Sequence, residues 1–499
     1  MNVADLILRQ GHDMAPAVLD GNHVLTYREL REQVAVVAKA LLARGHARGD
    51  RIGLFAENGS FFITAYLGII RAGLVAVPFQ TDVAPETFQK IVADAGIQEM
   101  FVSDRWLNRI RNWDSTAGIK LLSAASLAGA TGAGSATLPE TASESDLAAL
   151  MFTSGSTGLP KGVMVSHRNI ECNTRDIISY LGLAPRDRVL VVLPFHYCFG
   201  ASLLHTHLMA GGSVVLNNSF KLYPETVLQE IQQKECTGFA GVPSTYQILL
   251  RKSRFREMSF PSLRWFQQAG GKLPDPQIAE MLASFPAVRY FLMYGQTEGT
   301  ARLSYLPPEH LADKLGSIGR GLPSTRLEVL KSDGRAVVPG SDETGEIVAS
   351  GANITLGYWN DPAETAKYFR SGRLHTGDIA RVDADGFIFV VERERDMIKS
   401  GGNRVSAKEV EDVIAELPEV VEVAVLGVPH ELLGEAIQAF IVAGTEPKIT
   451  PESVQKHCRK RLAPFKVPET VTFLRNMPHN SSGKILKPKL KEMNGAVVR

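Results

Sequence analysis

Hydrophobic positions follow two alternating spacings along the first 120 residues of the chain. Tyr27 to Arg44 and Phe61 to Ala72 place apolar residues near helical spacing. The short apolar runs Arg51 to Phe55 and Ala76 to Pro78 are typical of buried strands. Strands that alternate with helices favour a parallel, doubly wound α/β sheet.

The same pattern resumes beyond a segment of biased composition. Ser123 to Ser145 is rich in Ala, Gly, Ser and Thr and has no periodicity, so we expect a connecting loop. Leu147 to Phe152 is a short apolar run that leads directly into a Gly/Ser/Thr-rich turn. Further strands are predicted at Arg188 to Leu193 and Ser213 to Leu216.

The pattern of apolar residues and turn signals changes at about Leu327. Short apolar runs then lie among turn signals and predict a β-rich subdomain; they contain Val329, Ala336–Val338, Gly345–Ala349 and Phe387–Val391.

Past Arg395 a new unit begins. It predicts helices at Ser406–Ala415 and Ser453–Leu462 and strands at Val421–Val428 and Ala436–Val442. We therefore expect an α/β chain with a large N-terminal domain of doubly wound sheets plus the β-rich subdomain (residues 1–394) and a small α+β C-terminal domain (residues 395–499).

Composition narrows the class of protein. With 44% hydrophobic and 21% charged residues the chain is of ordinary globular type, and its net charge of +1 gives no general attraction to nucleic acid or an acidic membrane. The four cysteines are scattered, without a zinc-type spacing. The N-terminus lacks the basic start of a signal peptide, and no apolar run approaches the ~20 residues that span a bilayer. These features predict a cytoplasmic protein with no membrane span and no nucleic-acid partner.

The segment from Thr153 to Val163 carries the first chemical signal. It reads Thr-Ser-Gly-Ser-Thr-Gly-Leu-Pro-Lys-Gly-Val. Glycines let backbone amides approach an anion, and the hydroxyls and Lys161 add further donors, so the segment suits a loop that holds phosphate oxygens. It lacks the Walker A spacing, which disfavours a P-loop ATPase or kinase.

This segment resembles the phosphate loop of the adenylate-forming superfamily, which comprises acyl-CoA synthetases, peptide-synthetase adenylation domains and firefly luciferases. The resemblance extends from about Leu25 to Lys484, with further motifs in the family's order at Tyr294–Glu298, Thr376–Asp378 and Asn480–Lys484. It implies a large domain with a mobile small domain, the cofactors ATP, Mg²⁺ and CoA or a phosphopantetheine carrier, and an AMP-forming acid–thiol ligase.

The resemblance also implies roles for single residues. Thr297 would contact the α-phosphate and Glu298 would hold Mg²⁺, a hard cation that prefers carboxylate oxygen. Asp378 would bind the ribose hydroxyls, and Lys484 would bridge the substrate carboxylate and the α-phosphate as the catalytic lysine. The full set implied for ATP or AMP is Thr153, Ser154, Gly155, Ser156, Thr157, Gly158, Lys161, Gly271, Lys272, Tyr294, Gly295, Gln296, Asp378 and Arg393. Lys272 stands where the family usually has a small residue.

The small domain of such enzymes takes two orientations, one for each half-reaction. The resemblance places the hinge at Arg395, where the family usually has Asp or Lys. Lys399, Ser400, Gly401 and Gly402 resemble the loop that lines the thiol tunnel, where glycines would let the pantetheine arm pass.

The acyl pocket is predicted around Pro194 to Gly200. Depending on the register, His196 or Tyr197 is the gate residue. Neither register supplies an acid to pair with a substrate ammonium, which disfavours an α-amino acid. The other walls would come from Phe239, Gly241, Val242, Gly299 and Thr300, which favour an aryl or aliphatic carboxylate. No Arg or Lys stands out as a partner for a second substrate carboxylate.

Three functions remain open on the sequence. The first is an acyl-CoA ligase, with a basic stretch that could meet CoA phosphates at His457, Arg459, Lys460, Arg461 and Lys466. The second is a stand-alone enzyme that loads the acyl group onto a carrier protein. The third is a relative without enzymatic activity, which Thr297, Glu298, Asp378 and Lys484 argue against.

Overall fold

The computed structural model describes residues 2–113, 116, 118–124, 143–154, 160–220, 222–393, 397–400, 402–430, 433–444, 449–480, 483 and 485–497, and every structural statement below concerns these residues. Its strands form four sheets. Of the side chains within these ranges, those of Ser154, Arg393 and Arg404 and of residues 392, 397 and 494–497 are outside the description.

Two large, mostly parallel sheets form the framework of the N-terminal part of the chain. In the described residues the first has the order β6-β5-β3-β4-β7-β8, formed by Lys120–Leu122, Glu99–Val102, Arg51–Phe55, Val75–Pro78, Leu147–Ser154 and Pro160–Ser166. Its neighbours pair in parallel except β7 and β8, which run antiparallel and flank residues 155–159 of the predicted phosphate loop. The doubly wound α/β class expected from the sequence is thus confirmed.

The second sheet has the order β14-β13-β12-β11-β9-β10-β1-β2 over the described chain. These strands are Ser304–Leu306, Arg289–Tyr294, Trp265–Gln268, Gly238–Gly241, Arg188–Val191, Ser213–Leu216, Pro16–Asp20 and His23–Thr26. The first hairpin of the chain, β1–β2, thus joins a sheet made of residues far along the sequence, with Val18 beside Val214. The periodicity gave no sign of this pairing, because it specifies a strand but not its partner.

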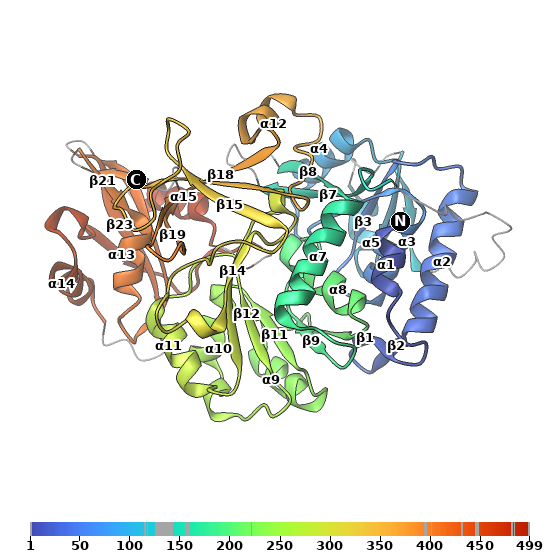
Figure 1. Cartoon of the computed structure of the whole chain (residues 1–499), viewed down its shortest axis with the longest axis horizontal. Helices are drawn as coiled ribbons and strands as arrows, with labels where there is room; N and C mark the ends of the chain where they lie inside the picture. The colour runs from blue at the N-terminus through green and yellow to red at the C-terminus, as the bar shows by residue number, and fades with distance from the viewer. Residues whose placement is uncertain are drawn as a thin grey trace.

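Helices fill the space between these sheets and cover their outer faces. Figure 1 shows α7 and α8 at the centre of the molecule, between the two sheets. Every residue of α8 is buried, including the polar Ser202, His205, Thr206 and His207. The helices of this part are α1 (Val3–Leu8), α2 (Tyr27–Ala43), α3 (Ser60–Arg71), α4 (Pro85–Ala95), α5 (Asp104–Arg111), α7 (His167–Leu181), α8 (Cys198–Met209), α9 (Pro224–Gln233), α10 (Pro243–Lys252) and α11 (Asp275–Ser284).

The packed layer between the sheets is called here the inter-sheet core. It joins residues of both sheets to α1, α2, α3, α7 and α8, and includes Leu54, Val163, Phe199, Val242 and Phe291. A second cluster, the outer core, lies on the other face of the eight-stranded sheet and includes Phe239, Tyr246, Phe266, Tyr290 and Leu292. Successive residues of β12 and β13 alternate between these cores, as the pleat of a strand requires.

The β-rich region forms a sheet of its own. Within the described chain its order is β15-β16-β18-β17, and β19 also pairs with β18; the bounds are Thr325–Leu330, Gly345–Gly351, Arg373–Val382, Phe369–Arg370 and Ile388–Arg393. Helix α12 (Pro362–Tyr368) precedes β17. Ala336–Val338 forms only a single bridge, from Leu330 to Ala336, so this predicted apolar run has irregular backbone instead of a strand.

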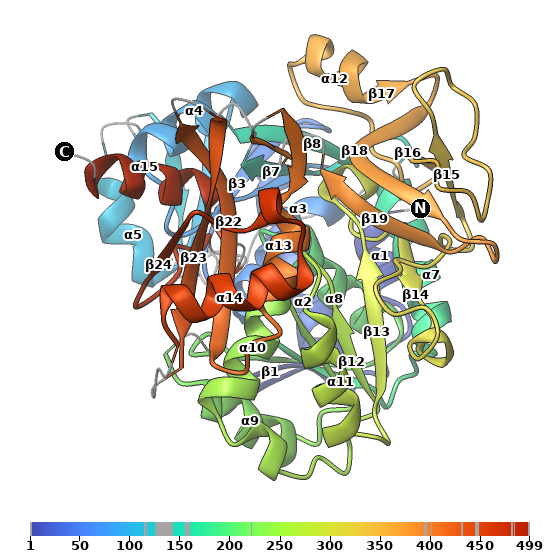
Figure 2. The ribbon, with the colours of Figure 1, turned by 90° about the vertical axis from the view of Figure 1, so that its left-hand side faces the viewer.

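The C-terminal unit confirms the predicted α+β pattern. Its sheet has the order β21-β20-β23-β22 with β24 beside β23, formed by Asn403–Ser406, Met397–Ser400, Gly434–Ala443, Val420–His430 and Thr470–Phe473. Its helices are α13 (Ala407–Ile414), α14 (Pro451–Arg461) and α15 (Lys487–Val497), and Figure 2 shows α13 and α14 in front of the sheet. The proposed boundary at residues 394 and 395 lies outside the described residues and stays a prediction.

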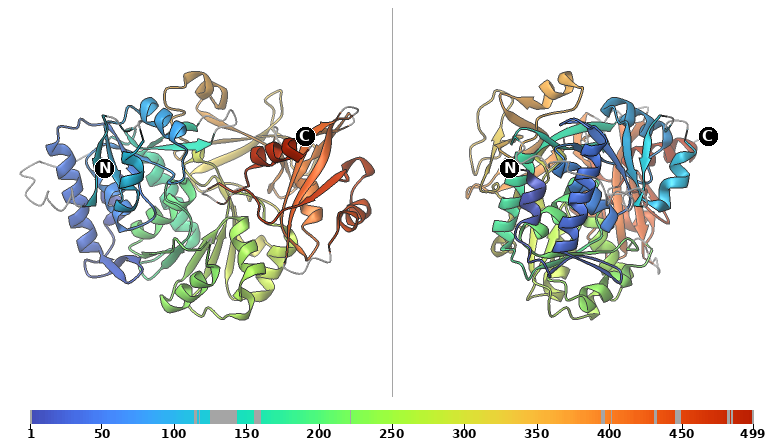
Figure 3. Two further views of the ribbon diagram at one scale, coloured as in Figure 1. Left: turned by 180° about the vertical axis from the view of Figure 1, so that it is seen from behind. Right: turned by 90° about the vertical axis from the view of Figure 1, so that its right-hand side faces the viewer.

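The C-terminal unit and the first helices of the chain lie far apart along the long axis of the molecule (Figure 3). Figure 3 shows the C-terminal unit at one end of this axis and α1 and α2 near the other. Among the described residues, no helix has the length and apolar character needed to cross a bilayer.

Candidate functional site

The most buried carboxylate among the predicted site residues is that of Asp378. It lies on β18 and is 2% exposed. The hydroxyl of Tyr294, the last residue of β13, donates to its Oδ2 at 2.5 Å. On the neighbouring strand the backbone of Arg393 is in register with Asp378. Two predicted nucleotide residues from different sheets are therefore joined directly.

Glu298 lies in a short 3₁₀ turn, Thr297–Gly299, that follows β13. Its Oε1 accepts a hydrogen bond from the hydroxyl of Tyr358 at 2.7 Å. Burial raises the pKa of Tyr358, and the adjacent charge of Glu298 raises it further, so this hydroxyl keeps its proton. Tyr358 therefore acts as a permanent donor that orients the carboxylate.

Two unpartnered polar atoms flank Glu298. The amide Nε2 of Gln296 and the Oγ1 of Thr355 are buried without a hydrogen-bond partner in the described chain, and the backbone of Thr355 donates to the Glu298 carbonyl at 3.0 Å. Buried polar groups are normally paired. The carboxylate, the amide and the hydroxyl together fit a polar, metal-bearing ligand such as a nucleotide with Mg²⁺.

Lys161 is the second residue of β8 and belongs to the predicted phosphate-loop segment. Its ammonium forms an ion pair with Glu364 of α12 and lies 5.5 Å from the centre of the Tyr358 ring. Thr153 of β7 is its register partner. Gly155, Ser156, Thr157 and Gly158 lie outside the described residues, so their predicted phosphate contacts stay a prediction.

The gate region meets the C-terminal unit at one point. A side chain added at Gly270 would lie 3.0 Å from Val242 and 3.7 Å from the Tyr197 hydroxyl, so these residues meet closely. Gly483, whose φ of +80° favours glycine, has its carbonyl 2.8 Å from the donating hydroxyl of Ser244. The residue before Lys484 therefore lies beside Val242, although Lys484 itself is outside the described residues. The Tyr197 hydroxyl thus lies near Gly270 and Val242, and the assignment of the gate to His196 or Tyr197 stays a prediction.

Lys272 makes a second contact between the two units. Its ammonium lies 3.2 Å from carboxylate oxygens of both Asp275 and Asp412, and Asp412 belongs to α13. Although burial lowers the pKa of Lys272, the charges of Asp412 and Asp275 raise it above its usual value. The resemblance predicts a small residue at this position. The charge of Lys272 is instead paired with Asp412 of the C-terminal unit.

One predicted wall residue is in the wrong place. The side chain of Phe239 packs in the outer core, on the opposite face of the sheet from Val242 and Cys198. Ala240 occupies the pocket-side position of β11 instead. Side chains alternate along a strand, so an assignment shifted by one residue moves the side chain to the other face.

The wall formed by Gly299 and Thr300 is a strained turn. Thr300 has φ +68° and ψ −44°, and the amide of Ala301 donates to the Gly299 carbonyl at 2.8 Å. This is a γ-turn with positive φ, a rare conformation that is costly for a β-branched residue. The hydroxyl of Thr300 holds it by donating to the Asn353 carbonyl at 2.6 Å.

The model of the family described as AMP-binding enzyme matches residues 9–359, and that of its C-terminal domain matches residues 409–484. The chain belongs to the AMP-binding enzyme family. A similar sequence is a feruloyl-CoA synthase of Amycolatopsis sp., 34% identical over 96% of both chains. The predicted family and its two-part architecture are thereby confirmed.

Solved structures of similar proteins cover nearly the whole of this AMP-binding enzyme. The anthranilate CoA ligase AuaEII, in complex with anthranoyl-AMP, is 25% identical over 99% of this chain and 98% of its own, with a TM-score of 0.91. The o-succinylbenzoate CoA synthetase of Bacillus subtilis, in complex with ATP and magnesium, is 27% identical over 98% and 99%, with a TM-score of 0.85.

The predicted thiol loop lies in the C-terminal sheet of this family member. Lys399 and Ser400 end β20, the Lys399 amide donates to Glu435 at 2.7 Å, and Gly402 has a φ of +79°. Gly401 and the hinge residue Arg395 lie outside the described residues. The role of this loop stays a prediction.

The basic stretch suggested for CoA is partly paired with acids. His457 lies 3.0 Å and Arg461 3.4 Å from Glu416, and Lys466 lies 2.7 Å from Glu409. Arg459 and Lys460 are exposed on α14. Only part of the stretch is thus open to a phosphate.

Sequence reasoning missed Tyr358, Glu364, Ser244 and Arg302. The first three act through partners that are distant in the sequence, and no local pattern marks them. Arg302 carried a signal, because it is a charged residue between Ala301 and Leu303 in an apolar wall segment.

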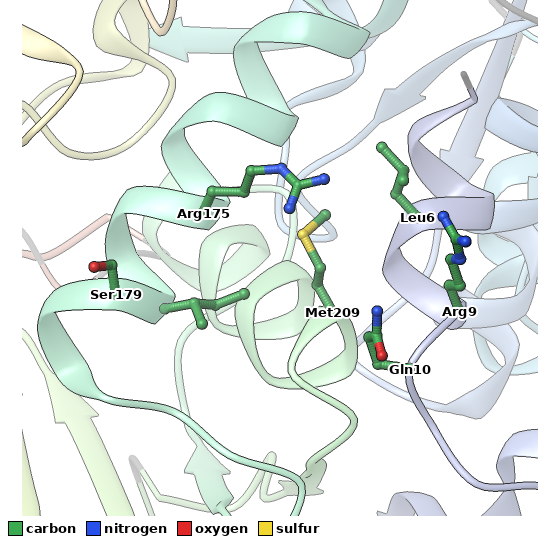
Figure 4. A pocket seen from close by; sticks show the side chains of 7 residues that line it. Leu6, Arg9, Gln10, Arg175, Ser179 and Met209 are labelled. Carbon is green, nitrogen blue, oxygen red and sulfur yellow. The ribbon is translucent and has the colours of Figure 1, made fainter.

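A cavity of about 280 Å³ lies elsewhere, among α1, α7 and α8. Figure 4 shows Leu6, Arg175 and Met209 pointing toward one another and Ser179 pointing away. The complete lining is Leu6, Arg9, Gln10, Arg175, Ile178, Ser179 and Met209, which includes none of the predicted site residues.

Proposed function

We propose that this AMP-binding enzyme activates a carboxylic acid with ATP and transfers the acyl group to CoA. In the first step a carboxylate oxygen attacks the α-phosphorus, the bond to the β-phosphate breaks, and pyrophosphate leaves. In the second step the CoA thiolate attacks the acyl carbonyl and AMP leaves. The contact between Gly483 and Ser244 supports the first step most directly, because it brings the C-terminal lysine loop to the gate.

The nucleotide would lie between β13, β18 and the turn after β13. Asp378 would accept the ribose hydroxyls, with Tyr294 fixing the carboxylate, and Thr297 would meet the α-phosphate. Lys161 would exchange its pairing with Glu364 for the phosphates. The predicted set of nucleotide residues is otherwise kept as proposed.

Mg²⁺ would be held by Glu298, oriented by the Tyr358 hydroxyl. When bound, the ion neutralises charge on the phosphates. The phosphate oxygens would give the Gln296 amide and the Thr355 hydroxyl the acceptors that they lack within the described chain.

Lys484 would offset the repulsion between the carboxylate and the phosphate in adenylation. A positive charge placed where negative charge gathers stabilises the transition state more than the ground state. Its position directly after Gly483 supports this role.

The acceptor is proposed to be CoA, because the similar proteins described above are CoA-dependent ligases. Loading of a carrier protein has no such support. The proposed cell compartment is the cytoplasm, in keeping with the four free cysteines of the described residues.

The test is pyrophosphate release with ATP and Mg²⁺ over a panel of aromatic, short-chain, medium-chain, dicarboxylic and amino acids. CoA and a phosphopantetheinylated carrier protein are then offered separately. We expect acid-dependent release and an acyl-CoA product. Release without any acyl-CoA would overturn the acceptor, and no release with any acid would overturn the activity.

A further inference from the structure

Arg302 is a buried cation without an acidic partner. It is 1% exposed. Its Nε lies 3.1 Å from the sulfur of Met293 and its Nη1 3.5 Å from the Ala301 carbonyl oxygen. Its Nη2 has no hydrogen-bond partner, and no carboxylate in the described part of the chain lies within ion-pair distance. A guanidinium is always charged, so burial cannot neutralise it.

Aromatic side chains provide the rest of its surroundings. The guanidinium lies 4.0 Å from the centre of the Phe199 ring, which stabilises a cation through the face of the ring. Burial raises the pKa of Tyr180 to about 12, against the opposing effects of the Arg302 charge and of a hydrogen bond to Arg302, so this neighbour supplies a neutral hydroxyl and no anion. The local structure thus retains the charge but leaves one donor unused.

Arg302 lies at the acyl end of the proposed site. Phe199 is two residues from Tyr197, one of the two predicted gate residues. The sulfur of Cys198, between them, accepts a hydrogen bond from the Thr297 hydroxyl at 3.4 Å. On its own segment Arg302 follows the strained turn at Thr300. Strain of this kind persists where the surrounding structure fixes a functional position.

A second unpartnered group lies on the same face of the sheet. Gln267 is 0% exposed, and neither atom of its amide has a partner in the described residues. Trp265 and Ala269 on either side belong to the inter-sheet core, so alternation directs Gln267 to that face. Its register partner Phe291 is two residues from Met293, the contact of Arg302.

We propose that Arg302, assisted by Gln267, recognises a second carboxylate at the far end of the acid substrate. The preferred substrate would be a dicarboxylic acid, one carboxylate of which is activated while the other pairs with the guanidinium. An anion is the group that neutralises a buried guanidinium and also accepts from its free N–H. This inference rests on the proposed function and corrects the expectation that no cation serves a second substrate carboxylate.

The test compares acids in matched pairs that differ in the tail: adipate with hexanoate, succinate with butanoate, and terephthalate with 4-methylbenzoate. Pyrophosphate release should give a kcat/KM at least roughly 100-fold higher for the diacid of the pair that fits, because a site with buried polar groups rejects an analogue that cannot pair with them. Arg302→Met should remove or reverse this preference. Arg302→Lys should restore part of it, and Gln267→Leu should reduce it by about tenfold.

The matched control is Arg320→Met. Arg320 also lies over a phenylalanine, 4.2 Å from the centre of the Phe387 ring, and is exposed. We expect its loss to leave the preference unchanged. A wild-type preference for the monoacid in every pair overturns the inference, and so does an equal loss for both acids in Arg302→Met.

Thermal unfolding of the wild-type protein gives a reading that does not depend on turnover. The diacid should raise the unfolding midpoint more than its monoacid at equal concentration, because only a bound ligand stabilises the folded state. If the diacid raises the midpoint more than the monoacid but no pyrophosphate is released, the proposed activity is overturned and recognition of the second carboxylate is supported. Equal midpoints with both acids overturn the recognition, even where Arg302 variants do not fold.

Discussion

At the nucleotide end of the site, Tyr294 donates to Asp378 and Tyr358 donates to Glu298, whereas at the acyl end Arg302 and Gln267 have donors with no acceptor in the described chain. The first pair of contacts orients carboxylates for a ligand that all members of such a family share. Gln296 and Thr355 at the nucleotide end also lack partners among the described residues. The two ends therefore differ in charge: the nucleotide end holds carboxylates that tyrosine hydroxyls orient, and the proposed acyl end holds a buried guanidinium that would take its counter-charge from the substrate.

The largest effect is expected from Lys484→Ala, which removes the charge that would act between the two ends. Acyl-AMP formation should fall by ~10²–10³, because a preorganised charge is lost at the reacting phosphate. Thioester formation from supplied acyl-AMP should persist. Single-turnover assays of each half-reaction measure this, with the exposed Lys489→Ala as control. Equal loss in both half-reactions contradicts the role.

Tyr358→Phe removes the hydrogen bond to Glu298 at the nucleotide end and changes no described contact of Arg302 or Gln267 at the acyl end. Loss of a hydrogen bond to a charged group corresponds to about 1.5–3 kcal/mol, or roughly 10- to 100-fold in kcat/KM for ATP. The preference among acids should not change. Tyr368→Phe is the control, since its ring also lies near Lys161, at 6.0 Å. A change in acid preference instead of ATP dependence would show that the two ends are not separable.

The acyl-end helix α8 carries buried neutral histidines. Burial lowers the pKa of His205 to about 3 and of His207 to about 4. The unfolded chain, with a pKa near 6.5, therefore binds more protons, and the free energy of unfolding should decrease by about 1.4 kcal/mol per pH unit for each histidine as the pH falls below ~6.5.

His205→Gln keeps a partner for the Tyr66 hydroxyl, which lies 3.1 Å from His205, and should reduce this slope. Denaturant unfolding between pH 7 and pH 5 measures it, with the exposed His12→Gln as control. Identical slopes for His205→Gln and the wild-type protein would rule out His205 as a source of the pH dependence.

The smallest effect is expected at the Lys272–Asp412 pair, which joins the units near the gate. Both side chains are about one third exposed, so the pair contributes at most about 1 kcal/mol. Asp412→Asn should slow adenylation by up to about fivefold at low salt and less at high salt, since ions screen the pair. Lys314→Ala, which breaks pairs with Asp383 and Asp385, is the control. An effect independent of salt would contradict the electrostatic cause.

Residues of the nucleotide end could be assigned from the sequence because they lie in short contiguous motifs, and their roles stay predictions. Tyr294, Glu298 and Asp378 were assigned from such motifs, and their contacts are compatible with these roles. Tyr358 could not be assigned, because its partner Glu298 is 60 residues away and only the fold brings them together.

The acyl end was harder to predict for a different reason. Phe239 and Ala240 are adjacent, and only the strand's orientation decides which of them faces the substrate. The importance of Arg302 depends on its burial, and a sequence does not show which charges are buried.

The long-range pairing of the first hairpin has a consequence for synthesis of the chain on the ribosome. The hydroxyl of Tyr27 donates to the Gly212 carbonyl, 185 residues further along. At ~5–20 residues per second, roughly 10–40 s pass before that partner has been translated. During this interval the hairpin β1–β2 lacks its neighbouring strand β10, so it is the segment in which we expect the nascent protein to need a chaperone most.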